Sequence, residues 1–476
     1  MRRMLWPKFR LVSLVVLLGV AGCNTLDTEV DQIATIAELQ YQCGPFFSEF
    51  GLGYQEHFLE WTPDGTQIIF NYTREGRPDI NRHFRAAAWA VDSQGTWVRM
   101  HVDAGHGYPL LYGLHADVSP DGARIVYGCC EFPTESIAVE PYDTERKRIR
   151  YEIAVIDLDG TGQQRLTENE HIDQYPVWSP DGSSIAFIAN PRTPGSHGGM
   201  ELFIMAADGS DVRRGASTLI RESTDTEGFY YWRTNYYYTN RGIEVDDAEE
   251  PWLAALTMAS PVWSPDGERL AFLVYAGGPS RRTRHLLYTV RTDGSEMTKI
   301  AETAHMVGIS ENSERIYIGL GVPSWSPSGE YLAYVGVDET GEASGVYTVR
   351  PDGTDLRQVL QPQGPDWNVF HVSWSPAGAE ILVASQQGLY FIQPDGSGLR
   401  MVDEKVAFAA YDMTLGIAVA WSPSGERIAL YMPGSAYLDV PPQLYTIARD
   451  GTDRRDLIRV DDDGNLVPAN PPQETP

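Results

Sequence analysis

Four histidines have positions that could bring them together as metal ligands. They precede copies of a recurring pentapeptide by 4, 3, 7 and 3 residues, in the order His57, His115, His171 and His371. Asp117 and Asp173 lie nearby, and imidazole and carboxylate groups suit a divalent metal. The unequal spacings favour the alternative that these histidines are scattered over the surface or packed between repeats. We therefore expect no cofactor, with a divalent metal as the alternative.

A second group of residues has the chemistry of a binding surface. Aromatic side chains crowd one segment, namely Phe229, Tyr230, Tyr231, Trp232, Tyr236, Tyr237 and Tyr238. The acidic run DDAEE follows at 246–250. Clustered Tyr and Trp suit protein interfaces or stacking against sugars, so we expect a binding site here. The alternative is that these rings plug or cover the fold as part of its core.

The first 23 residues have the order of a lipoprotein signal. A basic region precedes the apolar run LVSLVVLLGV at 11–20, which is too short for a spanning helix of about 20 residues. The run ends in VAGC at 20–23, which resembles the bacterial lipobox. We therefore expect a signal peptide over 1–22 and a lipid on Cys23. The protein would be exported and membrane-anchored, facing the periplasm or the cell exterior. An ordinary signal peptide with an incidental cysteine is the alternative.

Three further cysteines remain after Cys23. An exported compartment permits disulfides, so Cys43 is a candidate partner for Cys129 or Cys130. Free buried thiols are the alternative. The cysteine and histidine spacings do not match a structural zinc site.

One pentapeptide recurs seven times, and its copies begin 57, 60, 85, 62, 49 and 47 residues apart. We call the first residue of each copy its lead residue. Pro presets φ and Gly accepts positive φ, so each copy predicts a tight turn. The copies are WTPDG at 61–65, VSPDG at 118–122, WSPDG at 178–182 and 263–267, WSPSG at 325–329 and 421–425, and WSPAG at 374–378.

Each repeat continues with an apolar run and a second turn. A run such as Ile125-Val126-Tyr127 follows every pentapeptide and predicts a buried strand. In six repeats an Asp-Gly pair then marks a hairpin, whereas the first repeat has Ser93-Gln94-Gly95. Each repeat thus predicts four antiparallel strands, A to D, and radial stacking would bury both sheet faces. The sequence predicts an all-β fold, a single β-propeller of seven blades, with the lead tryptophans packed between blades.

These repeats resemble those of TolB-like β-propellers over residues 51–460. The resemblance implies the fold and not the partners of TolB, because about 28 residues between Cys23 and the first blade leave no room for its N-terminal α/β domain. The signature of WD repeats is absent. We expect a tether at 23–50, a lengthened B–C loop at 131–150, an insertion at about 215–260 between strands D and A, and a hairpin at 303–320. The acidic, Pro-rich tail at 461–476 is expected to be disordered.

Charge and motifs narrow the function. With 65 acidic and 37 basic residues the net charge is −28, which disfavours nucleic acid as a partner. A GxSxG nucleophile elbow is absent, so a prolyl-oligopeptidase-like hydrolase is not expected. We expect a non-enzymatic scaffold that binds an envelope or extracellular protein, or a glycan. The alternative is a carbohydrate-active enzyme resembling oligogalacturonate lyases, which are propellers that hold a metal with histidines at the channel mouth.

Overall fold

The computed structural model describes most of the repeat region, beginning at Phe58. The chain separates into the units 1–49 and 50–476, and every described element belongs to the second. None of the described residues forms a helix that could span a membrane. The described residues are 58–74, 85–106, 116–131, 150–169, 171–190, 201–217, 255–258, 261–277, 282–306, 308–309, 315–316, 322–337, 344–363, 367, 369–404, 417–432, 441–461 and 465–472.

The first three blades follow the predicted order of strands. Blade 1 contains β1 (Leu59–Trp61), β2 (Gln67–Arg74), β3 (Arg85–Asp92) and β4 (Val98–His106). Blade 2 contains β5 (Ala116–Val118), β6 (Arg124–Glu131), β7 (Arg150–Asp157) and β8 (Gln164–Arg165). Blade 3 contains β9 (Ile172–Trp178), β10 (Ser184–Asn190), β11 (Glu201–Ala206) and β12 (Arg213–Ser217). A parallel bridge between Tyr151 and Ile172 joins blades 2 and 3 into one sheet.

The remaining blades repeat this plan. Blade 4 contains β13 (Ala255–Met258) and β14 (Val262–Trp263), which both pair with β15 (Arg269–Gly277), then β16 (Arg282–Arg291) and β17 (Thr298–Met306). Blade 5 contains β20 (Ser324–Trp325), β21 (Leu332–Val337), β22 (Ser344–Val349) and β23 (Arg357–Leu360). Blade 6 contains β24 (Val369–Trp374), β25 (Ile381–Ser385), β26 (Gly388–Ile392) and β27 (Arg400–Asp403). Blade 7 contains β28 (Ala418–Trp421), β29 (Arg427–Met432), β30 (Gln443–Ala448) and β31 (Arg455–Asp456).

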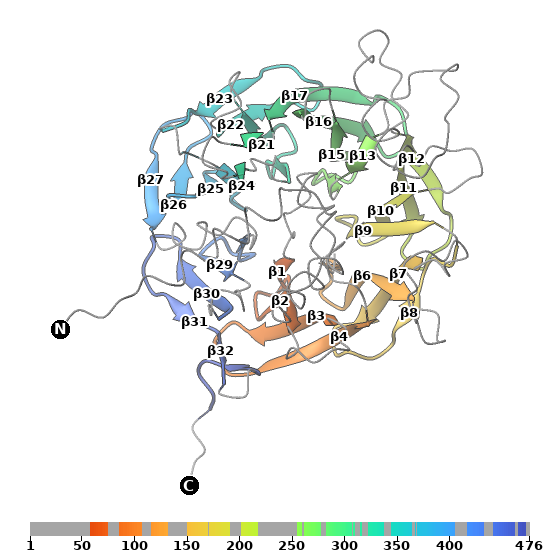
Figure 1. Ribbon diagram of the computed structural model, residues 1–476, viewed down its shortest axis with the longest axis vertical. Coiled ribbons are helices and arrows are strands. Elements are labelled where there is room, and N and C mark those ends of the chain that lie inside the picture. The colour runs from red at the N-terminus through yellow and green to blue at the C-terminus, as the bar shows by residue number, and fades with distance from the viewer. Residues whose placement is uncertain are drawn as a thin grey trace, which may run out of the picture. The chain divides into compact units, whose positions relative to one another are not determined.

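The blades surround a common axis. Strand A of each blade lies innermost and strand D lies outermost (Figure 1). The prediction of an all-β, seven-bladed propeller is confirmed. The hairpin expected at 303–320 is present as β18 (Gly308–Ile309) and β19 (Arg315–Ile316), which pair with each other. Residues 132–149 of the lengthened loop in blade 2 lie outside the described part.

The pentapeptide forms the turn between strands A and B. In blade 2 the hydroxyl of Ser119 donates to Asp121 Oδ1 at 2.6 Å, and its oxygen accepts from the amide of Arg124 at 2.9 Å. The amide of Gly122 donates to the Ser119 carbonyl at 2.7 Å, and Gly122 has φ of 71°. A residue with a Cβ would be strained at that φ, which explains the glycine of the motif.

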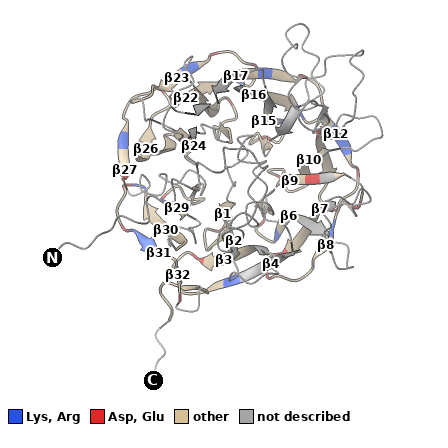
Figure 2. Ribbon diagram, viewed as in Figure 1, with Lys and Arg blue, Asp and Glu red and all other residues tan. Residues whose placement is uncertain are grey.

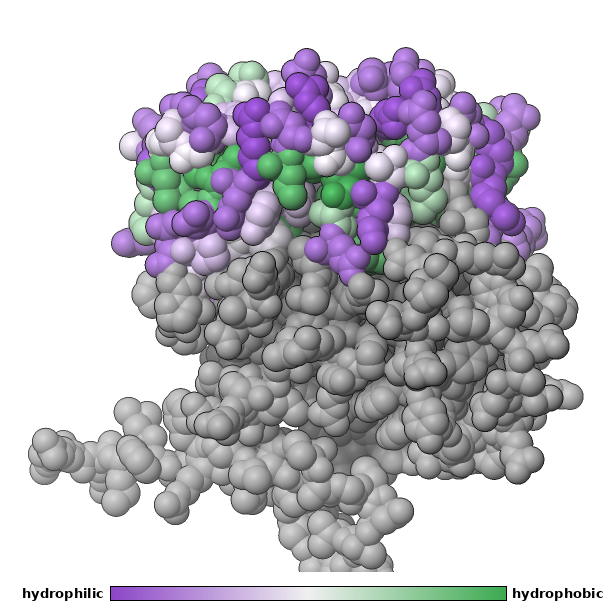
Figure 3. All heavy atoms as spheres, turned by 90° about the horizontal axis from the view of Figure 1, so that it is seen from above, coloured by the Kyte–Doolittle hydropathy of each residue, from purple (hydrophilic) through white to green (hydrophobic). Residues whose placement is uncertain are grey.

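The second turn joins strands C and D on the same rim of the ring. In blade 3 the amide of Gly209 donates to the Ala206 carbonyl at 2.9 Å, and that of Ser210 donates to Asp208 Oδ1 at 2.9 Å. Since both turns lie on one face, we call it the turn face. In the side view it forms a hydrophilic rim above a belt of hydrophobic residues (Figure 3).

The core lies between the blades. Between blades 1 and 2, Ile69 and Ala90 pack with Ile125 and Ile156, and all four are buried. The predicted packing of lead tryptophans between blades is confirmed, because three of the indole N–H groups donate to the preceding blade. The bonds run from Trp61 to the Ala420 carbonyl at 3.3 Å, from Trp263 to Val177 at 3.3 Å and from Trp325 to Val262 at 3.2 Å.

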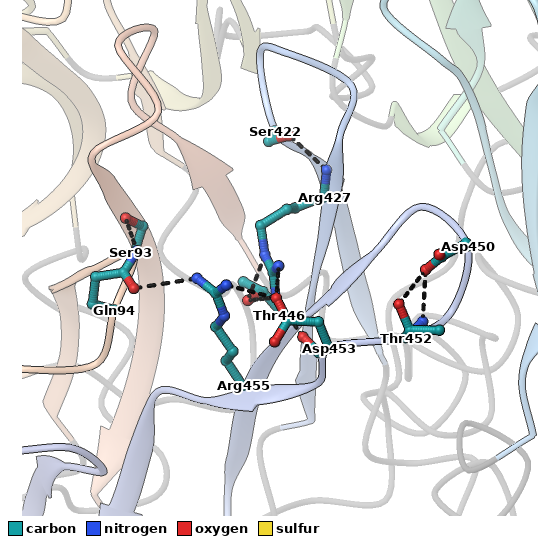
Figure 4. Close-up of polar contacts among 9 residues, drawn as sticks. All are labelled: Ser93, Gln94, Ser422, Arg427, Thr446, Asp450, Thr452, Asp453 and Arg455. Carbon is teal, nitrogen blue, oxygen red and sulfur yellow. Dashed lines mark hydrogen bonds and ion pairs between the residues drawn. The ribbon is translucent and has the colours of Figure 1, made fainter.

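Blade 7 meets blade 1 through a C-terminal hairpin of β32 (Ile458–Val460) and β33 (Leu466–Pro468). Leu457 and Leu466 are buried in the core cluster that blades 7 and 1 share. The Asn470 amide N–H donates to the Gly95 carbonyl of blade 1 at 2.8 Å. Arg455 reaches Gln94 Oε1 at 3.2 Å beside the Arg427–Asp453 ion pair (Figure 4).

This hairpin differs from the expectation of disorder after Asp461. Polar and proline-rich composition predicts disorder in isolation, whereas Leu457 and Leu466 gain a buried site between two blades. All four strands of blade 7 come from one stretch of sequence, as do those of blade 1. The hairpin therefore takes the place of a strand shared between the first and last blades.

Candidate functional site

The aromatic segment belongs to the connection between blades 3 and 4. It leaves β12, the outermost strand of blade 3, and returns as β13, the first strand of blade 4. The predicted D-to-A connection is thus present at this point of the ring. Residues 218–254, and with them Phe229 to Tyr238, lie outside the described part. Their role in binding stays a prediction.

The histidines do not meet in the described part of the chain. His57 and His115 lie outside it. His171 precedes β9 in blade 3, and its amide donates to Asn169 Oδ1 at 2.5 Å. His371 lies in β24 of blade 6, where its Nε2 is 3.2 Å from Ser373 Oγ and burial lowers the pKa of its imidazole to about 4. Among the described residues no three His, Cys, Asp or Glu side chains are placed to hold a metal ion. His171 and His371 therefore do not support the alternative of a histidine-bound metal.

Two of the three cysteines of the predicted disulfide lie in the described part of the chain. Cys129 and Cys130 lie in β6, opposite Glu152 and Tyr151 of β7. Cys23 and Cys43 lie outside the described residues, so lipidation and the disulfide stay predictions.

Polar side chains on the innermost strands bind the next blade. In three cases the residue before a lead residue accepts a hydrogen bond from the lead amide of the following blade. Glu60 Oε2 accepts from Val118 at 2.9 Å, Asp117 Oδ2 from Trp178 at 2.6 Å and Ser324 Oγ from Trp374 at 3.0 Å. These bonds fasten blade 1 to 2, blade 2 to 3 and blade 5 to 6.

Two of these acceptors are carboxyl groups that also bind each other. Burial, and then the adjacent Asp117, raise the pKa of Glu60 well above its usual range. Burial raises the pKa of Asp117 to about 7. A hydrogen bond between two carboxyl groups requires a proton on one of them, and burial of both groups stabilises that protonated form.

A third buried carboxyl lies further along the wall between blades 2 and 3. Asp173 accepts from Asn169 Nδ2 at 2.8 Å, and burial raises the pKa of Asp173 to about 6. Glu152 accepts from the Thr167 hydroxyl at 2.8 Å and from the Asn169 amide N–H at 3.0 Å. The D-to-A connection of blade 2 is thereby fixed against β9.

This arrangement joins blades and does not resemble a catalytic constellation. Asp117 and Asp173, expected beside a possible metal, instead accept hydrogen bonds from the backbone or from an amide side chain. Glu60 was not among the predicted site residues. Its signal is visible in hindsight, since Glu60 and Asp117 precede lead residues where other repeats carry Val, Ser or Ala.

Comparisons with known proteins find partial similarities in sequence. No known family profile matches the chain. It is 23% identical over 310 residues to dipeptidyl-peptidase 5 of Porphyromonas gingivalis, covering 54% of this chain and 42% of that protein. An uncharacterized protein of Agrobacterium fabrum is 29% identical over 144 residues, or 26% of this chain and 47% of that protein. The chain thus spans less than half the length of either relative.

Two solved structures are similar at the level of fold alone. TolB from Acinetobacter baumannii has 12% identity and a TM-score of 0.38, covering 83% of this chain and 80% of TolB. Oligogalacturonate lyase from Vibrio parahaemolyticus has 11% identity and a TM-score of 0.45, covering 84% of this chain and 88% of the lyase. The repeated pentapeptide turn and the ring of seven four-stranded sheets define the class of this protein, a seven-bladed β-propeller whose repeats resemble those of TolB-like propellers.

Proposed function

We propose that this protein is an exported, lipid-anchored β-propeller that acts as a non-enzymatic binding scaffold outside the cytoplasm. Its partner would be an envelope or extracellular protein, or a glycan. The observation that carries the proposal is the long connection between β12 and β13. It interrupts the repeat once, at 218–254, while the strands on both sides remain complete.

The chemistry of the described residues supports a scaffold. The carboxyl groups near the axis are bound to neighbouring blades and to each other. Loops held by such a rigid frame are common binding sites. The aromatic residues Phe229 to Tyr238 have the composition of an interface and occupy this loop.

Deleting the connection tests the proposal. Residues 222–250 are replaced by a short Gly/Ser linker, and the variant is used beside wild type to capture partners from the native envelope. The free energy of unfolding should fall by only about 1–2 kcal/mol, because closure entropy depends weakly on loop length. Capture of the wild-type partner or glycan should be lost, because clustered Tyr and Trp dominate interface energies.

A matched variant separates loss of side chains from shortening of the loop. Tyr236→Ser, Tyr237→Ser and Tyr238→Ser together keep the length of the connection. This variant should also lose the partner. Unfolding or insolubility of both variants would show instead that the rings are part of the core, and undiminished capture by both would contradict the proposal.

A further inference from the structure

Blade 3 departs from the other blades at one position at the start of strand B, which is the first residue of that strand or the residue before it. This position lies two residues after the glycine of the pentapeptide. In six blades it carries a long polar side chain, namely Gln67, Arg124, Arg269, Tyr331, Glu380 and Arg427. In blade 3 it carries Ser184, which is too short to reach a neighbouring blade.

Between blades 2 and 3 the long side chain at this position covers the lead residue of the next blade. Between blades 2 and 3 the guanidinium carbon of Arg124 lies 4.9 Å from the centroid of the Trp178 ring. Lead tryptophans that follow a blade with Arg or Tyr at this position are well covered. Their exposed fractions are 5% for Trp178, 8% for Trp325, 9% for Trp374 and 6% for Trp61.

The two lead tryptophans that are only half-buried are Trp263, which follows Ser184, and Trp421, which follows Glu380. Glu380 forms ion pairs with Arg449 at 2.8 Å and Arg400 at 3.4 Å. Ser184 and Trp263 line the same cavity, so the short side chain lies where Arg124 covers Trp178 in the preceding interface.

A cavity of about 300 Å³ occupies this position between blades 3 and 4, on the turn face. The residues that matter for recognition are Asp181, Ser183, Ser184, Arg213, Trp263 and Asp266. The indole N–H of Trp263 donates to the Val177 carbonyl at 3.3 Å, which holds the ring in place. Arg213 donates to the carbonyl of Thr292, across the same blade interface.

The two carboxylates of the cavity are rigid and ionised. Asp181 Oδ1 accepts from the Ser179 hydroxyl at 2.6 Å, and Asp266 Oδ1 accepts from the Ser264 hydroxyl at 2.6 Å. These bonds lower the pKa of both carboxyl groups. The hydrogen bonds of Asp266 within its turn use only Oδ1, so its Oδ2 presents a fixed acceptor to a ligand, whereas Asp181 Oδ2 also accepts from the Ser183 hydroxyl at 2.9 Å.

We propose that the cavity between blades 3 and 4 binds a single uncharged sugar ring, stacked on Trp263. An aromatic face beside a few convergent donors and acceptors fits a ring with an apolar C–H face and polar hydroxyl edges. The volume suits one ring, since ligand pockets begin at about 300 Å³. Asp181 and Asp266 disfavour a sugar acid, and the Arg213 guanidinium offsets one of their two charges. This site goes beyond the proposed function because the residues named here belong to the described parts of blades 3 and 4.

The test gives position 184 of blade 3 the type of residue that other blades carry there. Ser184→Arg introduces the side chain that blades 2, 4 and 7 carry, so the fold should accept it while Trp263 becomes covered. Gln67→Arg is the matched control, since it makes the same change in blade 1, where the next lead residue is Val118. The probes are the methyl glycosides of glucose, mannose and galactose, with galacturonate as the charged comparison. Binding is measured by saturation-transfer NMR and titration.

At least one uncharged glycoside should bind wild type and the Gln67→Arg variant, and the affinity should fall tenfold or more in Ser184→Arg. Should that protein misfold, Ser184→Tyr, which copies blade 5, gives the same comparison. Absence of binding by every uncharged glycoside, or equal affinity in the Ser184 variants, overturns the assignment. Neither result bears on partner capture by the 218–254 connection, which is tested separately by deleting that connection.

Discussion

At the scale of single residues, acidic side chains have two opposite roles in this protein. Aspartates of the turn face, such as Asp121 and Asp208, accept hydrogen bonds from nearby hydroxyls, which lower the pKa of their carboxyl groups. Glu60 and Asp117 near the axis instead have a raised pKa, because burial disfavours their charged forms. The two groups therefore shift stability in opposite directions with pH.

The sign follows from proton linkage. A carboxyl group whose pKa is raised in the folded state contributes its full stability below the unfolded-state pKa of about 4. This contribution is lost as the pH rises through the pKa of the folded state. For Asp117 that value is about 7, and for Asp173 about 6. The turn aspartates act only in acid, where their stabilisation is lost as the pH falls through their lowered pKa values.

We expect the free energy of unfolding of wild type to fall between pH 5 and pH 8, by roughly 2–4 kcal/mol. Glu60→Gln should flatten this dependence, because a neutral amide can accept from Val118 and donate to Asp117 without holding a proton. Urea unfolding at pH 5, 6, 7 and 8 measures both slopes.

The control for this prediction is Ser324→Ala, which removes the equivalent bond to Trp374 in blade 6 without a titrating group. It should cost about 1 kcal/mol at every pH. Equal pH slopes in wild type and Glu60→Gln would contradict a shared proton.

At the scale of elements, the ring is held by contacts that recur from blade to blade and by one that does not recur. Some recurring contacts join the inner strands, as in the bond from Trp325 to the Val262 carbonyl. Others join an outer strand to the C–D turn of the next blade, as in the bond from Arg400 to the Arg449 carbonyl at 3.4 Å. Basic residues lie on the outer strands β12, β27 and β31 (Figure 2). The contact without a repeat is the hairpin of β32 and β33.

We expect the hairpin to be necessary for a stable ring. Leu457 is fully buried, and its backbone lies so close to Gly95 that a Cβ there would come within 2.8 Å of its Cα. Leu457→Ala should therefore destabilise the protein by about 3 kcal/mol, as for other buried leucines. Removal of 457–476 should open the contact between blades 7 and 1, and X-ray scattering should then report a larger radius of gyration.

Leu399→Ala, at the residue before β27 of blade 6, provides the control, because Leu399 is 38% exposed. Its effect should stay within about 0.5 kcal/mol. If the truncated chain melted at the wild-type temperature with an unchanged radius, the hairpin would be a peripheral addition to the ring.

At the scale of the whole molecule, the proposed anchor determines where the propeller acts. The VAGC sequence ending at Cys23 predicts a mature protein that begins there and carries a lipid. Intact mass spectrometry of protein from the native envelope should show the added mass, together with partition into detergent. Cys23→Ser should abolish both while leaving the melting temperature unchanged. Recovery of unmodified wild type in the aqueous phase would contradict the anchor.

The sequence alone determined the blade plan of this protein, because the responsible interactions act within a few residues. Pro, Gly and a hydroxyl–carboxylate bond build each turn locally, as in Ser119 to Gly122, and the apolar runs between turns leave only strands to form. The four-stranded repeat and its number of copies could therefore be predicted. The 218–254 connection could also be located, as the one long break in the spacing of the copies.

Only the tertiary structure decided which distant side chains meet. Glu60 and Asp117 form a hydrogen bond across two blades, although they are separated by 57 positions in the chain. Leu466 is buried in the core cluster that blades 7 and 1 share, so part of the polar tail helps to join the last blade to the first. Trp263 lines a cavity with Ser184 of the preceding blade, while its counterpart Trp178 is covered by Arg124. These contacts depend on how far side chains extend from one blade to the next. The periodicity of the sequence carries no information about the distance between side chains of different blades.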